Sequence, residues 1–200
     1  MSSFQKTLII TAGIIVFVLI GGCSYVGGKY NGLVKRQESV KSAWAEVGNQ
    51  AKRRFDLIPN LVETVKGYAG HEKSLFVAVT EARAKVGQVN IKGLPNVEQL
   101  EQFNKTQDGL GASLSRLLVV QERYPELKAD KNFLALQEQL EGTENRLAYA
   151  RREYNNSAQG FNTYRLVFPN NIFAGIFNVS EAVYTEFEEV TKTAPAVEFN

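Results

Sequence analysis

The chain has 200 residues, enough for one domain and an anchor, and its 44% hydrophobic and 22% charged residues, with only 5 Pro, argue against long disordered linkers. A net charge of +2 gives no support to nucleic-acid binding, which needs a concentrated basic surface. The single cysteine, Cys23, excludes an intrachain disulfide, and the single histidine, His71, excludes a histidine-rich metal site.

Residues 7–28 form an uncharged stretch, and its central part, LIITAGIIVFVLI, is rich in aliphatic side chains. A transmembrane helix needs about 20 such residues to cross a hydrocarbon core of about 30 Å, so residues 1–28 are expected to be a membrane anchor. Two other interpretations stay open: a cleaved secretory signal, and a lipoprotein signal, because IGGC at 20–23 resembles a loose lipobox. All three place the protein at a membrane.

The side of the membrane that the main domain occupies stays open. Lys6 precedes the uncharged stretch, whereas Lys29, Lys35, Arg36 and Lys41 follow it closely. The positive-inside rule therefore favours a cytoplasmic domain, whereas lipid modification of a cysteine would imply export.

A long amphipathic helix is predicted from Lys29 to Gly70, about 60 Å at 1.5 Å per residue. Pro59, inside this segment, destabilises the helix by about 3 kcal/mol, because it removes one backbone hydrogen bond and crowds the carbonyl four residues earlier. The apolar pattern nevertheless continues through Pro59, which indicates a kinked or locally broken helix rather than a loop, so Pro59→Ala is expected to be neutral or stabilising. The apolar positions recur at helical spacing at Leu33, Val40, Trp44, Val47, Ala51, Phe55, Ile58, Val62, Val65 and Ala69.

Two further helical segments follow a pause at Gly70. The first continues through Val86 and ends at the loop GQVNIKGLPN, residues 87–96. Asn96 and Gln99 have the spacing of a capping box, so a second helix starts at residue 97 and ends near Arg123, because Pro125 disfavours helix at the residue before it. Residues 123–130, RYPELKAD, are expected to be a loop.

Asp130 is the expected N-cap of a last long helix, which runs from Lys131 to about Val167. FPNN at 168–171 ends this helix. The tail from Asn171 to Asn200 carries an apolar cluster and is expected to fold back over one end of the bundle; the cluster comprises Ile172, Phe173, Ile176, Phe177, Tyr184 and Phe187.

Three long helices joined by short connections predict an all-α protein, in which an N-terminal transmembrane helix is followed by an elongated antiparallel helical bundle. The expected organisation is an anchor at 1–28 and a bundle domain with a C-terminal tail at 29–200. An extended intermolecular coiled coil is the alternative, which the short loops disfavour.

The sequence shows no catalytic, cofactor-binding or metal-binding residues. His71 and Glu72 match the first two residues of an HExxH motif, but Leu75 occupies the position of the second histidine, and the chain has no other histidine. The sequence also contains no phosphate-binding glycine loop. Two charged stretches are candidate interaction surfaces: Lys52–Asp56, and Arg146–Arg152, where Arg146, Arg151 and Arg152 could instead form surface ion pairs with Glu144 and Glu153. Amides at Asn31, Asn49, Gln50, Asn60, Asn145, Asn155 and Asn162 either fix helix register or line a ligand seam.

Several distinct motifs follow one another along the chain: YN at 30–31, Trp44 with Val47, RR at 53–54, DLIPNLVETVKGYAGHE at 56–72, EAR at 81–83, ERYPELKA at 122–129, Phe133, LEGTEN at 140–145, AR at 150–151, YN at 154–155 and FP at 168–169. In this order they resemble the LemA family of bacterial membrane proteins. The resemblance covers about residues 29–200. It implies a single N-terminal anchor and an elongated helical bundle, and it transfers no site residues, because the family has no accepted catalytic activity.

These observations predict a non-enzymatic, single-pass protein of the bacterial cell membrane, whose bundle contacts a protein partner or a second copy of itself, with no nucleic acid, no cofactor and no known small-molecule substrate. The alternative is a binding module for a small or lipidic ligand, seated among Tyr154, Phe161, Tyr164 and Phe173.

Overall fold

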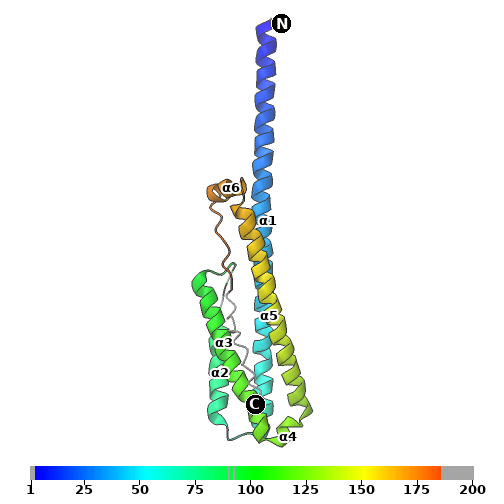
Figure 1. The fold of residues 1–200 in the computed structure, drawn as a ribbon, viewed down its shortest axis with the longest axis vertical. Coiled ribbons are helices and arrows are strands. Elements are labelled where there is room, and N and C mark those ends of the chain that lie inside the picture. The colour runs from blue at the N-terminus through cyan, green and yellow to red at the C-terminus, as the bar shows by residue number, and fades with distance from the viewer. Residues whose placement is uncertain (1–2, 90, 92, 186–200) are drawn as a thin grey trace, which may run out of the picture.

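One helix, α1 (Ser3–Tyr68), runs along the whole molecule in the computed structural model, which describes residues 3–89, 91 and 93–185 (Figure 1). α5 (Lys131–Leu166) lies antiparallel beside it, and α2 (Lys73–Gln88) and α3 (Val97–Val119) form a hairpin along the half of the bundle far from the N-terminus. α6 (Asn170–Ile176) sits at the other end, against α1 and α5. The described residues contain no strand, which confirms the predicted all-α antiparallel bundle.

α1 begins at Ser3 and not at Lys29, where the first bundle helix was expected to start. The segment predicted as an anchor and that helix therefore form one continuous helix. No proline separates them, and isolated glycines cost a helix only about 1 kcal/mol each. The N-terminal part projects beyond the other helices and contains a candidate membrane-spanning window with a mean hydropathy of 1.8 and no buried residue.

α1 passes through Pro59 without interruption, which confirms that the proline is not in a loop. Proline has no N–H, so the carbonyl of Phe55, four residues earlier, loses its usual helical donor. In its place Arg83 of α2 donates from Nε to that carbonyl at 3.2 Å, and its guanidinium stacks 3.8 Å from the centre of the Phe55 ring. The arginine thus satisfies the backbone at the proline and attaches α2 to α1.

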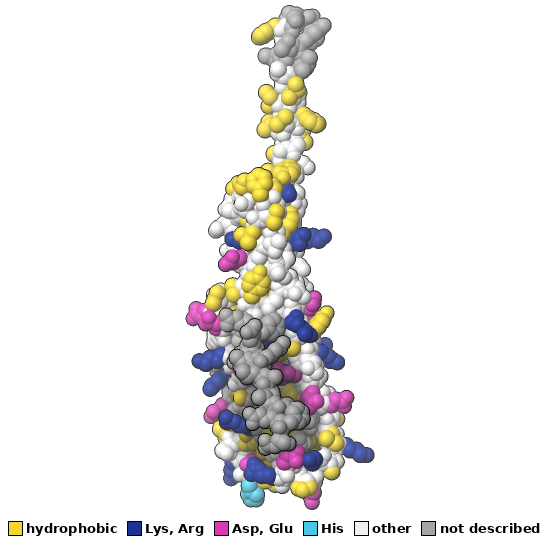
Figure 2. Space-filling view, in the orientation of Figure 1, with side chains coloured by type: hydrophobic (Ala, Val, Ile, Leu, Met, Phe, Trp, Pro, Cys, Tyr) yellow, Lys and Arg dark blue, Asp and Glu magenta, His cyan; other side chains and the backbone are white. Residues whose placement is uncertain are grey.

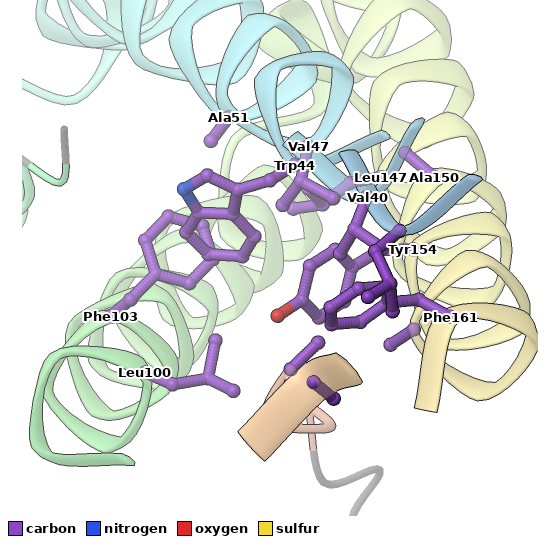
Figure 3. Packing of buried hydrophobic residues seen from close by; sticks show 14 residues of the cluster. Val40, Trp44, Val47, Ala51, Leu100, Phe103, Leu147, Ala150, Tyr154 and Phe161 are labelled. Atoms are coloured by element: carbon purple, nitrogen blue, oxygen red, sulfur yellow. The ribbon is translucent and has the colours of Figure 1, made fainter. Parts of the chain in front are cut away.

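The predicted apolar stripe of α1 is buried along its whole length except at Phe55, which is half-buried beneath Arg83. It feeds two core clusters. In the cluster nearer the membrane end, Trp44 packs edge-on against Phe103 and Tyr154, each with ring centroids 5.2 Å apart (Figure 3). The cluster at the distal end joins Ile58 and Val65 to Leu110 and Leu114 of α3 and Phe133 of α5.

The two predicted N-caps, Asn96 and Asp130, are confirmed. Asn96 accepts from the Gln99 N–H at 2.8 Å, and the Gln99 side chain accepts from the Asn96 N–H at 3.1 Å. Asp130 accepts from the Phe133 N–H at 2.8 Å and caps α5. A 3₁₀ turn, η1 (Val120–Arg123), follows α3 and ends at Arg123, where the second helix was predicted to end. The loop predicted at 123–130 is wrong in part, because Pro125 starts the short helix α4 (Pro125–Lys128). Proline is well tolerated at the first helical position.

The tail folds back as predicted, as far as the structure describes it; Phe187 and the other residues after Thr185 lie outside the described residues. After α6 the chain runs extended beside α5 to Thr185. Two asparagine side chains of α5 bind the backbone of this extended segment as a neighbouring β-strand would. Asn162 exchanges two hydrogen bonds with the backbone of Ala182, at 2.8 and 2.9 Å, and Asn155 exchanges two with the backbone of Thr185, at 3.0 and 2.9 Å.

The spacing of these pairs fits simple geometry. Seven residues of helix rise about 10 Å, and three residues of extended chain span about the same distance. Between the two pairs, the Tyr154 hydroxyl donates to the Val183 carbonyl at 2.6 Å. Residues 178–185, here termed the strap, are therefore held antiparallel to α5 by its side chains.

Candidate interaction groove

An open groove of about 670 Å³ lies between α1 and α5, on the distal half of the bundle. It brings together residues from both charged stretches singled out in the sequence, since Arg53 and Asp56 of α1 face Arg146 of α5 across it. Lys52 is not part of it and lines another depression, beside α2. The groove is lined by Arg53, Asp56, Leu57, Ala135, Glu138, Gln139, Gly142, Thr143 and Arg146.

The charged side chains of this groove are solvent-exposed and of both signs. Within the described residues, Arg53, Asp56, Glu138 and Arg146 make no hydrogen bond and no ion pair. The groove is also roomy at Gly142, where an added Cβ would meet no atom within 4 Å. The groove can therefore receive a chain that carries charges of both signs.

A buried polar layer crosses the bundle beside the groove, at the level of Arg54. This arginine is 5% exposed and separates the two core clusters. Its Nη2 lies 3.0 Å from Glu144 Oε2, and its Nη1 lies 3.5 Å from Oε1 of the buried Gln107. Burial lowers the pKa of the Arg54 guanidinium, and the charge of Glu144 opposes this effect.

The sequence did not distinguish Arg54 from its exposed neighbour Arg53, although its position provides a signal: Arg54 lies seven residues after Val47 and four before Ile58, on the apolar stripe. The ion pairs expected within α5 are also corrected. Glu144 pairs across to α1 rather than with Arg146, because Arg54 points at it from the core. Arg151 is half-buried, and burial lowers the pKa of its guanidinium.

The aromatic positions proposed for a ligand are part of the core. Tyr154 and Phe161 are fully buried, and Tyr164 and Phe173 are half-buried against the same cluster. Gly32 permits this packing, because a Cβ there would collide with the Tyr164 hydroxyl. Of the amides, Asn155 and Asn162 bind the strap and Gln50 is buried, whereas Asn31, Asn49, Asn60 and Asn145 are exposed.

The distal tip joins motifs from two parts of the sequence. Glu72, next to the exposed His71, lies 3.0 Å from the Arg123 guanidinium. The Tyr68 hydroxyl donates to Asp130 at 2.9 Å, which raises the pKa of Tyr68. The pKa of Asp130 is lowered, first by the Phe133 N–H and then by Tyr68. These contacts tie the α1–α2 turn to the start of α5, and we assign them a structural role.

Comparison with known proteins gives matches over most of the chain. A family model described as LemA family matches residues 43–199. A protein named Protein LemA from Metamycoplasma hominis is 27% identical over 190 residues, which cover 94% of this chain and 80% of the relative. Magnetosome protein MamQ 2 from Paramagnetospirillum magneticum is 26% identical over 175 residues, and Magnetosome protein MamQ from Magnetospirillum gryphiswaldense is 25% identical over 175 residues. Each of these two matches covers 78% of this chain but only 64% of the magnetosome protein.

Proposed function

This chain belongs to the LemA family, and we propose that it is a single-pass protein of the bacterial cell membrane that binds another protein, or a second copy of itself, and catalyses no reaction. Residues 1–28 anchor it, and the bundle domain, residues 29–200, extends from the end of the anchor. Because α1 continues from the candidate span into the bundle, the rod holds the groove at a fixed distance from the bilayer. The match to the family and to the magnetosome proteins supports a membrane-associated role.

The observation that carries the interaction role is the set of unpaired charges in the groove. Arg53, Asp56, Glu138 and Arg146 lie on two long antiparallel helices, so the spacing of their backbone positions is fixed before any partner arrives. A partner whose charges complement this pattern would gain contacts without rearranging the backbone of the groove, which favours association rate and specificity. The floor, with Leu57 and Ala135, offers apolar contact between the charges.

A photocrosslinking experiment in intact membranes tests this role. A photoreactive amino acid is placed at Gly142 in the full chain and, as a matched control, at Gly109 of α3, where an added Cβ likewise meets nothing within 4 Å. We expect a discrete adduct from position 142, either with one partner or at twice the mass of the chain, and none from position 109. Equal labelling from both positions, or no adduct from either, would contradict the proposal.

A further inference from the structure

A second apolar surface lies at the end of the bundle nearest the N-terminal span. The segment LVFPNNIFAGIF, residues 166–177, contains no charged residue and exposes most of its large side chains. The surface stands out around α6 in Figure 2, below the projecting N-terminal helix. We term residues 166–177 the apolar collar; its exposed members are Leu166 (63%), Val167 (54%), Phe168 (74%), Ile172 (51%), Ile176 (68%) and Phe177 (38%).

This concentration differs from the rest of the bundle. On α2, α3 and the distal part of α5, exposed large apolar residues such as Val77, Val119 and Leu134 occur singly. Scattered apolar residues are normal on a soluble surface, whereas a continuous apolar patch marks a site of contact with a partner or a membrane.

The collar is fixed at one particular height on α1. Phe173 packs against Tyr25, with ring centroids 6.1 Å apart, and Phe177 against Tyr30, at 4.8 Å. The uncharged stretch of α1 ends between these two tyrosines, because the next charge is Lys29. Its 22 residues span about 33 Å of helix, close to the thickness of a hydrocarbon core, and tyrosines are enriched where such spans reach the interface.

The charges beside the collar suit lipid headgroups. Lys29, Lys35 and Arg36 follow within two turns of helix, and no acidic residue lies among them. The Arg36 guanidinium stacks 4.4 Å from the centre of the Tyr164 ring, two residues before the collar begins. Cations just below an apolar surface are the arrangement by which interfacial segments bind anionic bilayers.

The strap keeps the collar in place. Arg165, directly before the collar, donates to the Val179 carbonyl at 2.8 Å, and Asn162 holds Ala182 three residues further along the strap. An open apolar depression of about 520 Å³ also lies between Phe177 and the end of the span, lined by Leu19, Val26 and Tyr30 among others. A lipid acyl chain has the apolar character that this lining requires.

We propose that the apolar collar inserts into the headgroup–acyl boundary of the same bilayer that α1 crosses, as a second membrane contact of the domain. The proposal rests on the membrane anchor of the proposed function, but not on the groove or its partner. With two contacts, the bundle cannot rotate freely about α1, so the groove faces a constant direction relative to the membrane plane.

Depth-dependent fluorescence quenching tests the collar in the full chain. In a Cys23→Ser background, an environment-sensitive fluorophore is attached through Ile172→Cys or Ile176→Cys. The matched controls are Leu134→Cys and Val119→Cys, whose native residues are exposed to nearly the same extent, 47% and 67%. Phe17→Cys reports whether the span itself is inserted. The protein is reconstituted in vesicles of phosphatidylethanolamine and phosphatidylglycerol that contain a lipid with a nitroxide near the headgroup.

We expect the nitroxide lipid to reduce the fluorescence at 172 and 176 about twofold, since interfacial helices bury their apolar face about 5–10 Å deep, and to leave 119 and 134 unchanged. If position 17 is inserted but positions 172 and 176 behave like the controls, the proposed membrane contact of the collar is wrong, whereas the proposed membrane anchor is supported. If no position senses lipid, both the anchor and the collar are wrong. Shielding at 172 and 176 that rises with protein concentration, without quenching by lipid, would assign the surface to a second copy and overturn the proposal.

Discussion

Tyr154 illustrates how single side chains of α5 hold the tail. Its ring is fully buried beside Trp44, and its hydroxyl donates to the Val183 carbonyl. Burial raises the pKa of Tyr154 to about 12. Above pH 10 the unfolded chain therefore releases this proton while the folded chain keeps it, so the contribution of Tyr154 to stability is constant below pH 10 and is lost as the pH rises toward 12.

The Tyr154→Phe variant tests this assignment. At pH 8 the free energy of unfolding of the full chain in detergent should fall by about 1 kcal/mol, because one hydrogen bond is lost and the Val183 carbonyl is left without it. The difference from the parent protein should shrink between pH 10 and 12, because only the parent loses stability through this residue. A difference that stays constant over this range would show that Tyr154 titrates normally.

Glu144 neutralises the buried polar layer beside the groove. Its Oε2 lies 3.0 Å from Nη2 of Arg54, and its negative charge also acts on the guanidinium of Arg151. Glu144→Gln should destabilise the protein by about 1–2 kcal/mol, less than for a fully buried pair because the Glu144 side chain is 52% exposed. Chemical denaturation measures this loss.

The control is Glu141→Gln, one turn earlier, where the exposed carboxylate, within the part of the chain that the structure describes, accepts a hydrogen bond from Gln137 of the same helix alone. This change should alter stability by less than about 0.5 kcal/mol. Adding Arg54→Met to Glu144→Gln should recover stability, because the uncompensated buried charge is removed. Equal losses for Glu141→Gln and Glu144→Gln would refute this role of the layer.

At the scale of elements, α1 continues through Pro59 because α2 supplies a donor for the orphaned carbonyl. Arg83→Met removes that donor and should cost about 1 kcal/mol. In a Pro59→Ala background the new N–H of residue 59 satisfies the Phe55 carbonyl, so the same change should cost clearly less. Thermal unfolding of the four proteins gives the coupling energy, which we expect to be about 0.5–1 kcal/mol. Lys85→Met, on the exposed side of α2, is the control and should show no coupling to Pro59.

Local signals predicted most of the helix boundaries. Asn96 with Gln99, Asp130, Gly70 and Pro125 act on residues at most a few positions away, so their effects can be deduced from the sequence. The strap could not be predicted from the sequence, because Asn155 and Asn162 bind backbone groups 20 to 30 residues later. Every residue has a backbone carbonyl, so the sequence does not indicate which carbonyl accepts. The donor for Phe55 comes from another helix for the same reason.

At the scale of the whole molecule, the length of the uncharged aliphatic stretch predicted the candidate span, and the apolar periodicity predicted the bundle, because each bundle helix buries one face. It could not predict the groove, since Arg53 and Arg146 are distant in sequence and meet only when α1 and α5 pack antiparallel. The charged stretches were predicted as candidates, and the structure selects Arg53 and Asp56 from one and Arg146 from the other. One continuous α1 then joins this groove to the candidate span.

Charge reversal in the groove tests the central claim, that its fixed charges bind a protein. In chains with the photoreactive residue at Gly142, Arg53→Glu with Arg146→Glu is compared with Lys52→Glu and Arg152→Glu, which alter the net charge equally outside the groove. Two lost ion pairs of about 0.7–1 kcal/mol each predict that the first pair of substitutions lowers the adduct at least about tenfold, while the second leaves it nearly unchanged. Equal adduct yields in the two variants would contradict the claim.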